Sequence, residues 1–371
     1  MKSIYLDNAA TTKLSQTTQK YLISILPEFG NPSSLHSTGQ KAKKIISDAR
    51  VSVAKFIHTT PENIYFTSGG SASNTLGIRG YYLKHRCNIA YSPIVHKSIL
   101  KCVGNYESTY PLKVDKYGLI NISDLRDWLN SKQTNPLVVI EYANSELGTI
   151  QNIEEIIHLI HLYNGIIYLD CTGSISTIPL DVSSLDVDMC GFSSHKLGGL
   201  KGCGVFYKKP DITIEPLIYG SQERELVGGT EDVLGIASLG KVAENYDYSS
   251  ITPECRDYVY NYIIKNIPDS YLVGTPIGEK RLLHNLYICF KCIEGESLMI
   301  LLDMNGIQVS TGSACNSGNL TTSTALSAIG INQEDIHSCI RMTFSGRETK
   351  EELDYVCIQL KKCVGRLRSL L

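Results

Sequence analysis

Apolar and β-branched runs alternate with amphipathic stretches over the first two thirds of the chain. The apolar runs are typical of buried strands, and we expect strands at 63–68, 88–93, 136–142, 165–170, 189–194 and 203–209. The stretches between them carry apolar residues at steps of three and four, which predicts helices over 34–57, 73–85, 96–104, 122–131 and 152–163. This alternation predicts an α/β fold with a mostly parallel sheet, whose ligand site lies at the carboxyl ends of the strands.

The pattern changes after about residue 248, where a polar segment with a proline interrupts it. Beyond it we expect shorter elements, namely strands near 285–291 and 307–310 and helices near 253–266, 294–304, 321–329 and 349–369. We therefore predict a large domain over 15–248. A smaller α+β domain would combine 1–14 with 249–371.

Composition narrows the class of protein. The net charge of −2 over 371 residues gives no basic excess, so we do not expect direct binding to nucleic acid. No apolar run is long enough to span a membrane, and the N-terminus lacks a secretory signal pattern, so we expect a cytoplasmic protein. The 12 cysteines do not suggest a disulfide framework. Cys289 and Cys292 form a C-x-x-C pair without a second one, and we expect no metal site.

Two side chains sit where strands end. Lys196 follows an apolar run and precedes a glycine-rich turn, which suits an amine that forms a Schiff base, although a surface lysine in a turn would look the same. Asp170 ends another apolar run. A carboxylate there needs a partner, which would be either a cationic ring nitrogen or the backbone at a helix start.

An anion site is indicated at 66–74, where a strand, a glycine-rich turn with Gly70 and Ser71, and a helix start follow one another. A plain strand-to-helix turn is the alternative. His96 follows the next strand and is placed to stack on a flat cofactor or to move protons, although many such histidines are structural.

Two further residues come from the second part of the chain. Cys315 lies in a segment of small and polar residues, which predicts an accessible thiol. Arg341 lies in an apolar strand-like run, where its guanidinium would bind a carboxylate from a substrate or from the protein itself.

The order of these motifs is more specific than any one of them. YLDNAATT, FGNPSSLHSTG, FTSGGSASN, His96, ANSELGTIQ, YLDCTGS, SSHKLGGLKGCG, GGT, EGESL, STGSAC and IRMTFSGR together resemble the cysteine desulfurases. These are fold-type I pyridoxal 5'-phosphate (PLP) enzymes of the class V aminotransferase superfamily. The close spacing of the last two motifs resembles the group with the longer, mobile cysteine loop.

The resemblance implies a role for each matching residue. Lys196 would hold PLP covalently, Asp170 would pair with the ring nitrogen, and His96 would stack on the ring and act as acid or base. The phosphate would be held by Gly70, Ser71, Ser193, His195 and, from the neighbouring subunit of a homodimer, Thr230. Ser145 would face the ring, while Arg341, Asn31 and Asn144 would bind the substrate. Cys315 would take sulfur from L-cysteine as a persulfide, release L-alanine, and pass the sulfur to an acceptor protein that the sequence does not identify.

Four positions depart from the family pattern. Ser145 stands where the family's second asparagine of N-N-E-x-G is expected, and Gly173 where a glutamine is expected. Both expected residues would contact the same ring oxygen. Ala72 and Val227 replace a glutamate and an arginine near the phosphate. Because of these departures, other activities remain open: the protein could be a selenocysteine lyase, an aminotransferase, or a degenerate partner protein without turnover.

Overall fold

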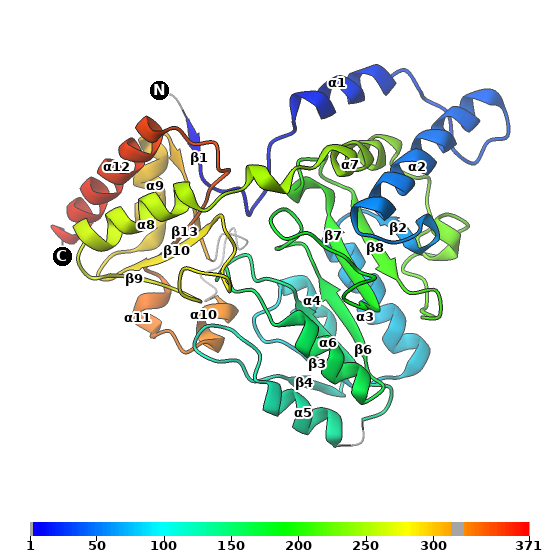
Figure 1. The fold of residues 1–371 in the computed structure, drawn as a ribbon, viewed down its shortest axis with the longest axis horizontal. Helices are drawn as coiled ribbons and strands as arrows, with labels where there is room; N and C mark the ends of the chain where they lie inside the picture. Colours follow the sequence, from blue (N-terminus) through cyan, green and yellow to red (C-terminus); the bar gives the residue numbers. More distant parts are fainter. Residues whose placement is uncertain (1–2, 132, 313–322, 371) are drawn as a thin grey trace.

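The computed structural model describes residues 3–131, 133–312 and 323–370. Within these residues a seven-stranded sheet forms the centre of the larger part of the molecule (Figure 1), in the order β2-β8-β7-β6-β5-β3-β4. Its strands are β2 (Ile64–Thr67), β3 (Ile89–Tyr91), β4 (Thr109–Pro111), β5 (Leu137–Glu141), β6 (Ile166–Asp170), β7 (Met189–Ser193) and β8 (Gly204–Lys208).

The sheet is mostly parallel, as the alternating pattern predicts. The five strands from β4 through β7 run parallel, whereas β8 pairs antiparallel with both β7 and β2. All six strands expected in this part of the chain form. The edge strand β4 was not expected from the sequence, since only three residues pair there.

Helices cover both faces of this sheet. Successive residues of β5 alternate between two apolar cores, one packed against α2, α5, α6 and α7 and the other against α3 and α4. The helices are α1 (Gln16–Ile25), α2 (Ser37–Phe56), α3 (Gly70–His85), α4 (Lys97–Val103), α5 (Ile122–Asn130), α6 (Ile153–Leu162) and α7 (Val233–Asn245). Because both faces are covered, the strands read as continuous apolar runs.

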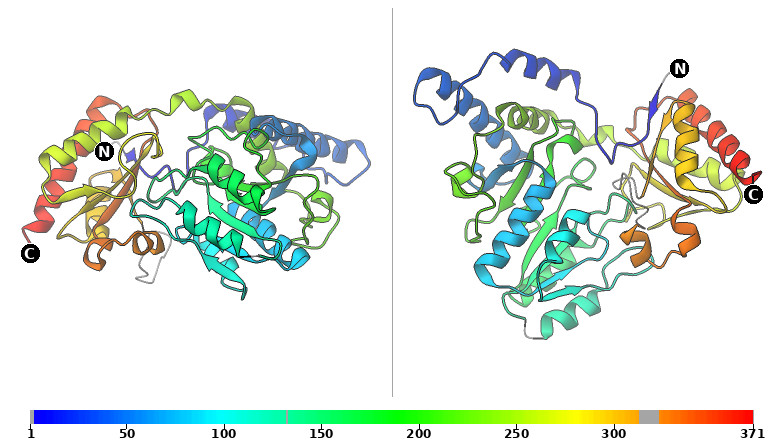
Figure 2. Two further views of the ribbon diagram at one scale, coloured as in Figure 1. Left: turned by 60° about the horizontal axis from the view of Figure 1, so that its bottom comes forward. Right: turned by 180° about the vertical axis from the view of Figure 1, so that it is seen from behind.

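A second, smaller sheet lies beside the first (Figure 2), in the order β12-β13-β10-β9. Its strands are β9 (Ser270–Leu272), β10 (Asn285–Phe290), β12 (Ser310–Thr311) and β13 (Cys339–Thr343), and the accompanying helices are α8 (Glu254–Asn266), α9 (Gly295–Met304), α10 (Thr324–Ala328), α11 (Gln333–Ile336) and α12 (Lys350–Arg368). One face packs on α8, α9 and α12. The other packs on α10 and α11, and on Ile94 and Leu147 from the larger part.

Residues 4–12 connect the smaller part of the molecule to the large sheet. Strand β1 (Ile4–Tyr5) pairs in parallel with β11 (Ile307–Gln308) on the smaller side. Thr343 at the end of β13 accepts the backbone N–H of Ala9 through its hydroxyl at 2.9 Å. Thr12 then donates to the carbonyl of His195 on the larger side, from its backbone N–H at 3.1 Å and from its hydroxyl at 2.8 Å.

Helices α2 and α7 approach closely at one point. A Cβ on Gly240 of α7 would lie 2.5 Å from the Cα of Ala49 on α2. Glycine ordinarily weakens a helix by about 1 kcal/mol relative to alanine, so its presence here is explained by the need for close contact.

We expect Gly240→Ala to destabilise the protein by roughly 1–3 kcal/mol, because an added methyl group has no room between these backbones. Urea unfolding measures the change. Gly365→Ala in α12 is the matched control, since nothing lies within 4 Å of its Cβ position, and it should stabilise by about 0.5–1 kcal/mol. Equal effects of the two substitutions would contradict the proposed close contact.

Candidate active site

A pocket lies at the edge of the large sheet where β5, β6 and β7 end. Parallel strands bring their carboxyl ends to one edge, and α3 and the residues before α4 close the sides. Its lining residues are Gly70, Ser71, Asn74, His96, Glu141, Ser145, Asp170, Thr172, Gly173, Ser193, His195 and Lys196. Most of the side chains singled out in the sequence therefore meet in one place.

Asp170 forms the floor of this pocket and is only 2% exposed. Its Oδ1 accepts the backbone N–H of Thr172 at 2.8 Å, and its Oδ2 accepts Nδ2 of Asn74 at 2.7 Å. The Oδ1 of Asn74 accepts the hydroxyl of Tyr168 at 2.7 Å, which fixes the orientation of the amide. A carboxylate stabilised by these donors is suited to face a cationic ring nitrogen.

Lys196 reaches the same pocket from the turn after β7. Its Nζ donates to the carbonyl of Ala9, and to the carbonyl of Ala10 at 3.0 Å. The N-terminal segment thus holds the amine at the pocket.

The N-terminus of α3 forms one end of the pocket, with Gly70 and Ser71 in its first turn. A Cβ on Gly70 would lie 2.8 Å from both Ser193 Oγ and Thr172 Oγ1, so only glycine fits this position. The hydroxyl of Thr172 is buried and has no hydrogen-bond partner within the described part of the chain. The start of a helix, an unpaired hydroxyl and a glycine cradle together suit a phosphate group.

His195 borders this end of the pocket as a neutral ring. Burial, and then the nearby charges of Lys196 and Lys201, lower the pKa of His195 to about 4. Its Nδ1 lies 3.2 Å from the hydroxyl of Thr11. At neutral pH it can therefore contribute one N–H to an anion but no full positive charge.

His96 precedes α4 and is connected to Asp170 through other side chains. Asn74 Nδ2 donates to Ser98 Oγ at 3.0 Å, and Ser98 Oγ lies 2.8 Å from His96 Nδ1. The backbone N–H of Ser98 also donates to this nitrogen, at 3.2 Å. Nδ1 is therefore the acceptor, and the proton of the neutral ring lies on Nε2.

The pKa of His96 lies below its usual value. Loss of solvent around the ring lowers this pKa most, the charges of Lys196 and Lys97 lower it further, and the carboxylate of Asp170 opposes them. His96 is thus a neutral ring near pH 7 that can exchange a proton within the pocket.

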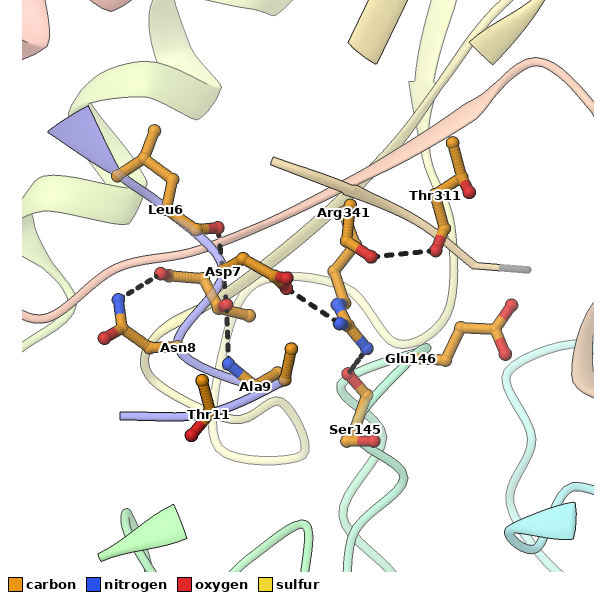
Figure 3. A network of polar contacts seen from close by, with 12 residues as sticks. Leu6, Asp7, Asn8, Ala9, Thr11, Ser145, Glu146, Thr311 and Arg341 are labelled. Atoms are coloured by element: carbon orange, nitrogen blue, oxygen red, sulfur yellow. Dashed lines mark hydrogen bonds and ion pairs between the residues drawn. The ribbon is translucent and has the colours of Figure 1, made fainter. Parts of the chain in front are cut away.

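Arg341 is not among the residues that line the pocket, and Figure 3 shows its side chain between Asp7 and Ser145. Its Nη2 forms an ion pair with Asp7 Oδ1 at 3.0 Å, and its Nη1 donates to the carbonyl of Ser145 at 3.3 Å. The internal ion pair left open by the sequence is present. The Nε atom is buried without a partner among the described residues.

The remaining predicted residues are placed differently. Asn144 does not line the pocket, and its amide donates to Ile94 O at 2.7 Å and to Glu141 Oε2 at 2.9 Å. Both of its donor protons are used within the protein, so in this arrangement it has none left for a substrate.

Asn31 and Thr230 are exposed and lie outside the lining of this pocket. Cys315 lies outside the described residues.

Four residues of the site were missed from the sequence: Asp7, Asn74, Glu141 and Thr172. Glu141 ends β5 just as Asp170 ends β6, so the same strand-end argument would have found it. Asn74 lies four residues after Gly70, on the same face of α3. Asp7 carries no local signal, because its partner Arg341 is 334 residues away.

Comparison with known proteins agrees with this site. The family described as aminotransferase class-V matches residues 4–356. A protein of Methanosarcina thermophila named cysteine desulfurase IscS is 36% identical over 384 residues, which cover 100% of this chain and 94% of the relative. Its namesake in Dictyoglomus turgidum is 37% identical over 388 residues, with 100% of this chain and 96% of the relative covered.

Solved structures agree as well. A NifS-like protein from Rickettsia africae superimposes with a TM-score of 0.90 at 27% identity, and the match covers 98% of this chain and 99% of that one. A structure titled SspA in complex with cysteine gives a TM-score of 0.81 at 27% identity over 94% of this chain and 100% of that one. The chain therefore belongs to the aminotransferase class-V family and, within it, to the PLP-dependent cysteine desulfurases.

Proposed function

We propose that this enzyme takes sulfur from L-cysteine, releases L-alanine, and carries the sulfur as a persulfide on Cys315. The main support for this proposal is that Lys196, Asp170 and His96 line the same pocket as the N-terminus of α3. An amine, a buried carboxylate, a neutral imidazole and an anion site are the groups that a PLP enzyme needs.

The residues of the pocket fit PLP. The unpaired Thr172 hydroxyl and the cradle at Gly70 would hold the phosphate together with Ser71, Ser193 and His195. Asp170 would pair with the ring nitrogen, and the amine of Lys196 would hold the cofactor covalently. When bound, the cofactor withdraws electrons from the substrate, which makes cleavage of the carbon–sulfur bond possible.

The protein's own side chains would bind and orient the cysteine. The buried, unpaired Nε of Arg341 offers a donor for the substrate carboxylate, while Asp7 keeps the guanidinium in place. Nε2 of His96 would exchange a proton with the substrate. The Cys315 thiol would attack the substrate sulfur, so that a sulfur–sulfur bond forms as the carbon–sulfur bond breaks.

The departures at 145 and 173 change one wall of this pocket without closing it. Both Ser145 and Gly173 line the pocket, and a Cβ at 173 would lie 2.4 Å from the carbonyl of Ala143. The backbone path here therefore requires glycine. Because the relatives at 36% and 37% identity are named cysteine desulfurases, we favour that activity over a selenocysteine lyase, an aminotransferase or an inactive partner.

The assembly and the cell compartment are also inferred. Thr230 is exposed and away from its own chain's pocket, which agrees with a homodimer in which it contacts the partner's phosphate site. We also infer the division into 15–248 and 1–14 with 249–371, since the strands of the large sheet fall within 64–208 and those of the four-stranded sheet within 270–343. None of the described helices is long and apolar enough to cross a membrane. We infer a cytoplasmic enzyme, with a sulfur-acceptor protein whose identity is open.

Cys315→Ser should keep the absorption of the bound cofactor and lower sulfide release from L-cysteine on the order of 1000-fold, because the hydroxyl is a poor sulfur acceptor. Sulfide and alanine assays measure this. Cys292→Ser is the matched control, since that thiol is exposed elsewhere on the surface. Normal turnover by Cys315→Ser would refute the assignment of the nucleophile.

Lys196→Ala should remove covalent attachment of the cofactor, because no other lysine among the described residues lines this pocket. After treatment with borohydride, mass spectrometry should find the cofactor on Lys196 in the wild type and on no residue in the variant. Lys241→Ala, in the neighbouring helix α7, serves as the control and should be labelled normally. Labelling of another lysine in the wild type would contradict the assignment.

Gly70→Ala should weaken PLP binding by about tenfold or more, because its methyl group would press on Ser193 and Thr172, which would hold the phosphate. Titration of the cofactor-free protein with PLP measures the affinity. Gly365→Ala, in α12 with nothing within 4 Å of the added Cβ and no positive φ, controls for a general effect of the added methyl group. An unchanged affinity in Gly70→Ala would place the phosphate elsewhere.

A further inference from the structure

Glu141 carries a second carboxyl group into the pocket, and the resemblance to the family assigns it no role. It is the last residue of β5 and is paired in register with Asp170, the last residue of the neighbouring strand β6. It lines the pocket and is half-buried. Two acids thus end adjacent parallel strands at the place where the cofactor ring would lie.

The two oxygens of Glu141 join separate segments of the chain. Oε1 accepts the backbone N–H of His96 at 2.7 Å, and Oε2 accepts Nδ2 of Asn144 at 2.9 Å. Asn144 in turn accepts the backbone N–H of Leu147 at 2.7 Å through Oδ1. Glu141 therefore connects the residue before α4 to the turn that follows β5.

The contacts to His96 determine how its ring is held. Nδ1 is bound by Ser98, and the backbone N–H by Glu141. These contacts approach from two sides and fix both the main chain and the ring. Without Glu141, the described hydrogen bonds of His96 would be those with residues 98–100 in the first turn of α4.

The charges around Glu141 favour its protonated form. The groups that face it are Asp170 on β6, Glu146 in the turn after β5, His96 before α4 and Lys196 after β7. Burial raises the pKa of Glu141 well above its usual range, and the carboxylates of Asp170 and Glu146 raise it further. The hydrogen bonds from Asn144 and His96 lower it, without reversing the shift. Two adjacent carboxyl groups in one site ordinarily do not both ionise.

We propose that Glu141 is a positioning residue that works as a neutral acid: it fixes His96 beside the pocket by accepting the backbone N–H of that residue, and it ties His96 to the turn after β5 through Asn144. The inference deepens the proposed function, since it rests on the role given there to His96. Glu141 acts through His96 and Asn144 and needs no contact with the substrate.

Two variants of the full-length holoenzyme test whether the hydrogen bond from the backbone N–H of His96 to Glu141 matters, independently of any charge on Glu141. Glu141→Gln keeps an oxygen for the backbone N–H of His96, whereas Glu141→Leu removes it. We expect kcat to fall about tenfold in Glu141→Leu with KM changed less than threefold, and Glu141→Gln to recover most of the loss. Equal losses in the two variants would overturn the positioning role.

Two measurements report whether Glu141 is charged in the holoenzyme. They are the acid limb of the pH–rate profile and the pH titration of the bound cofactor's absorption. If Glu141 is neutral, Glu141→Gln leaves the acid limb within about 0.3 pH units of the wild type, because no charge near His96 has been removed. A shift of that limb by about one unit to lower pH would show that Glu141 is ionised and would overturn the proposal.

The cofactor-free protein provides a test that is independent of activity. Because the folded-state pKa of Glu141 is raised above the usual 4.5, its stabilising contribution is complete below that pH and is lost as pH rises through the folded value. The melting temperature of the wild type should therefore fall relative to Glu141→Gln as pH rises above about 4.5. Glu154→Gln, on the exposed first turn of α6, should show no such trend.

Different results would refute the proposed desulfurase activity and the proposed role of Glu141. A wild-type protein that binds no PLP or releases no sulfide would refute the proposed function, while the melting comparison would still report the protonation of Glu141. Normal desulfuration together with a melting difference that does not vary with pH would refute the neutral acid alone.

Discussion

The buried carboxylate of Asp170 is the constraint around which the rest of the site is arranged. A charge with so little exposure is costly unless donors surround it, and the protein supplies two, from Asn74 and from the backbone of Thr172. Asn74 can reach it only because α3 begins at Gly70, one turn earlier and in contact with Ser193. The same helix start provides the anion site. The position of one acid therefore fixes where both ends of a cofactor would lie.

Much of this arrangement could be predicted from the sequence. The strands of the large sheet are buried on both faces, so their apolar runs stand out, and the residues that end them are found by position alone. Helices α1 and α7 were missed for physical reasons. Gly235 and Gly240 weaken the helical pattern of α7, while α1 buries none of its apolar side chains fully and exposes Ile23. Contacts between distant segments, such as Asp7 with Arg341, leave no local pattern, and Cys315 lies outside the described residues.

Two of the departures from the family pattern, Ser145 and Gly173, lie side by side in the structure. Positions 145 and 173 are neighbours in space, since a Cβ on Gly173 would lie 3.4 Å from the Cβ of Ser145. The two replacements therefore form a single local change in one wall of the pocket. Glu141 lies on the strand that leads into this wall, so the unusual wall and the additional acid belong to the same stretch of chain.

The N-terminal segment has a consequence for communication between the two sheets. Residues 4–9 are bound to the smaller sheet, while Thr12 is bound to His195 and the carbonyls of Ala9 and Ala10 hold the amine of Lys196. Any displacement of the smaller sheet must therefore be transmitted along a few backbone bonds to the lysine itself. The position of the reactive amine is thus tied through one short segment to strands β11 and β13, which lie far from Lys196 in the sequence.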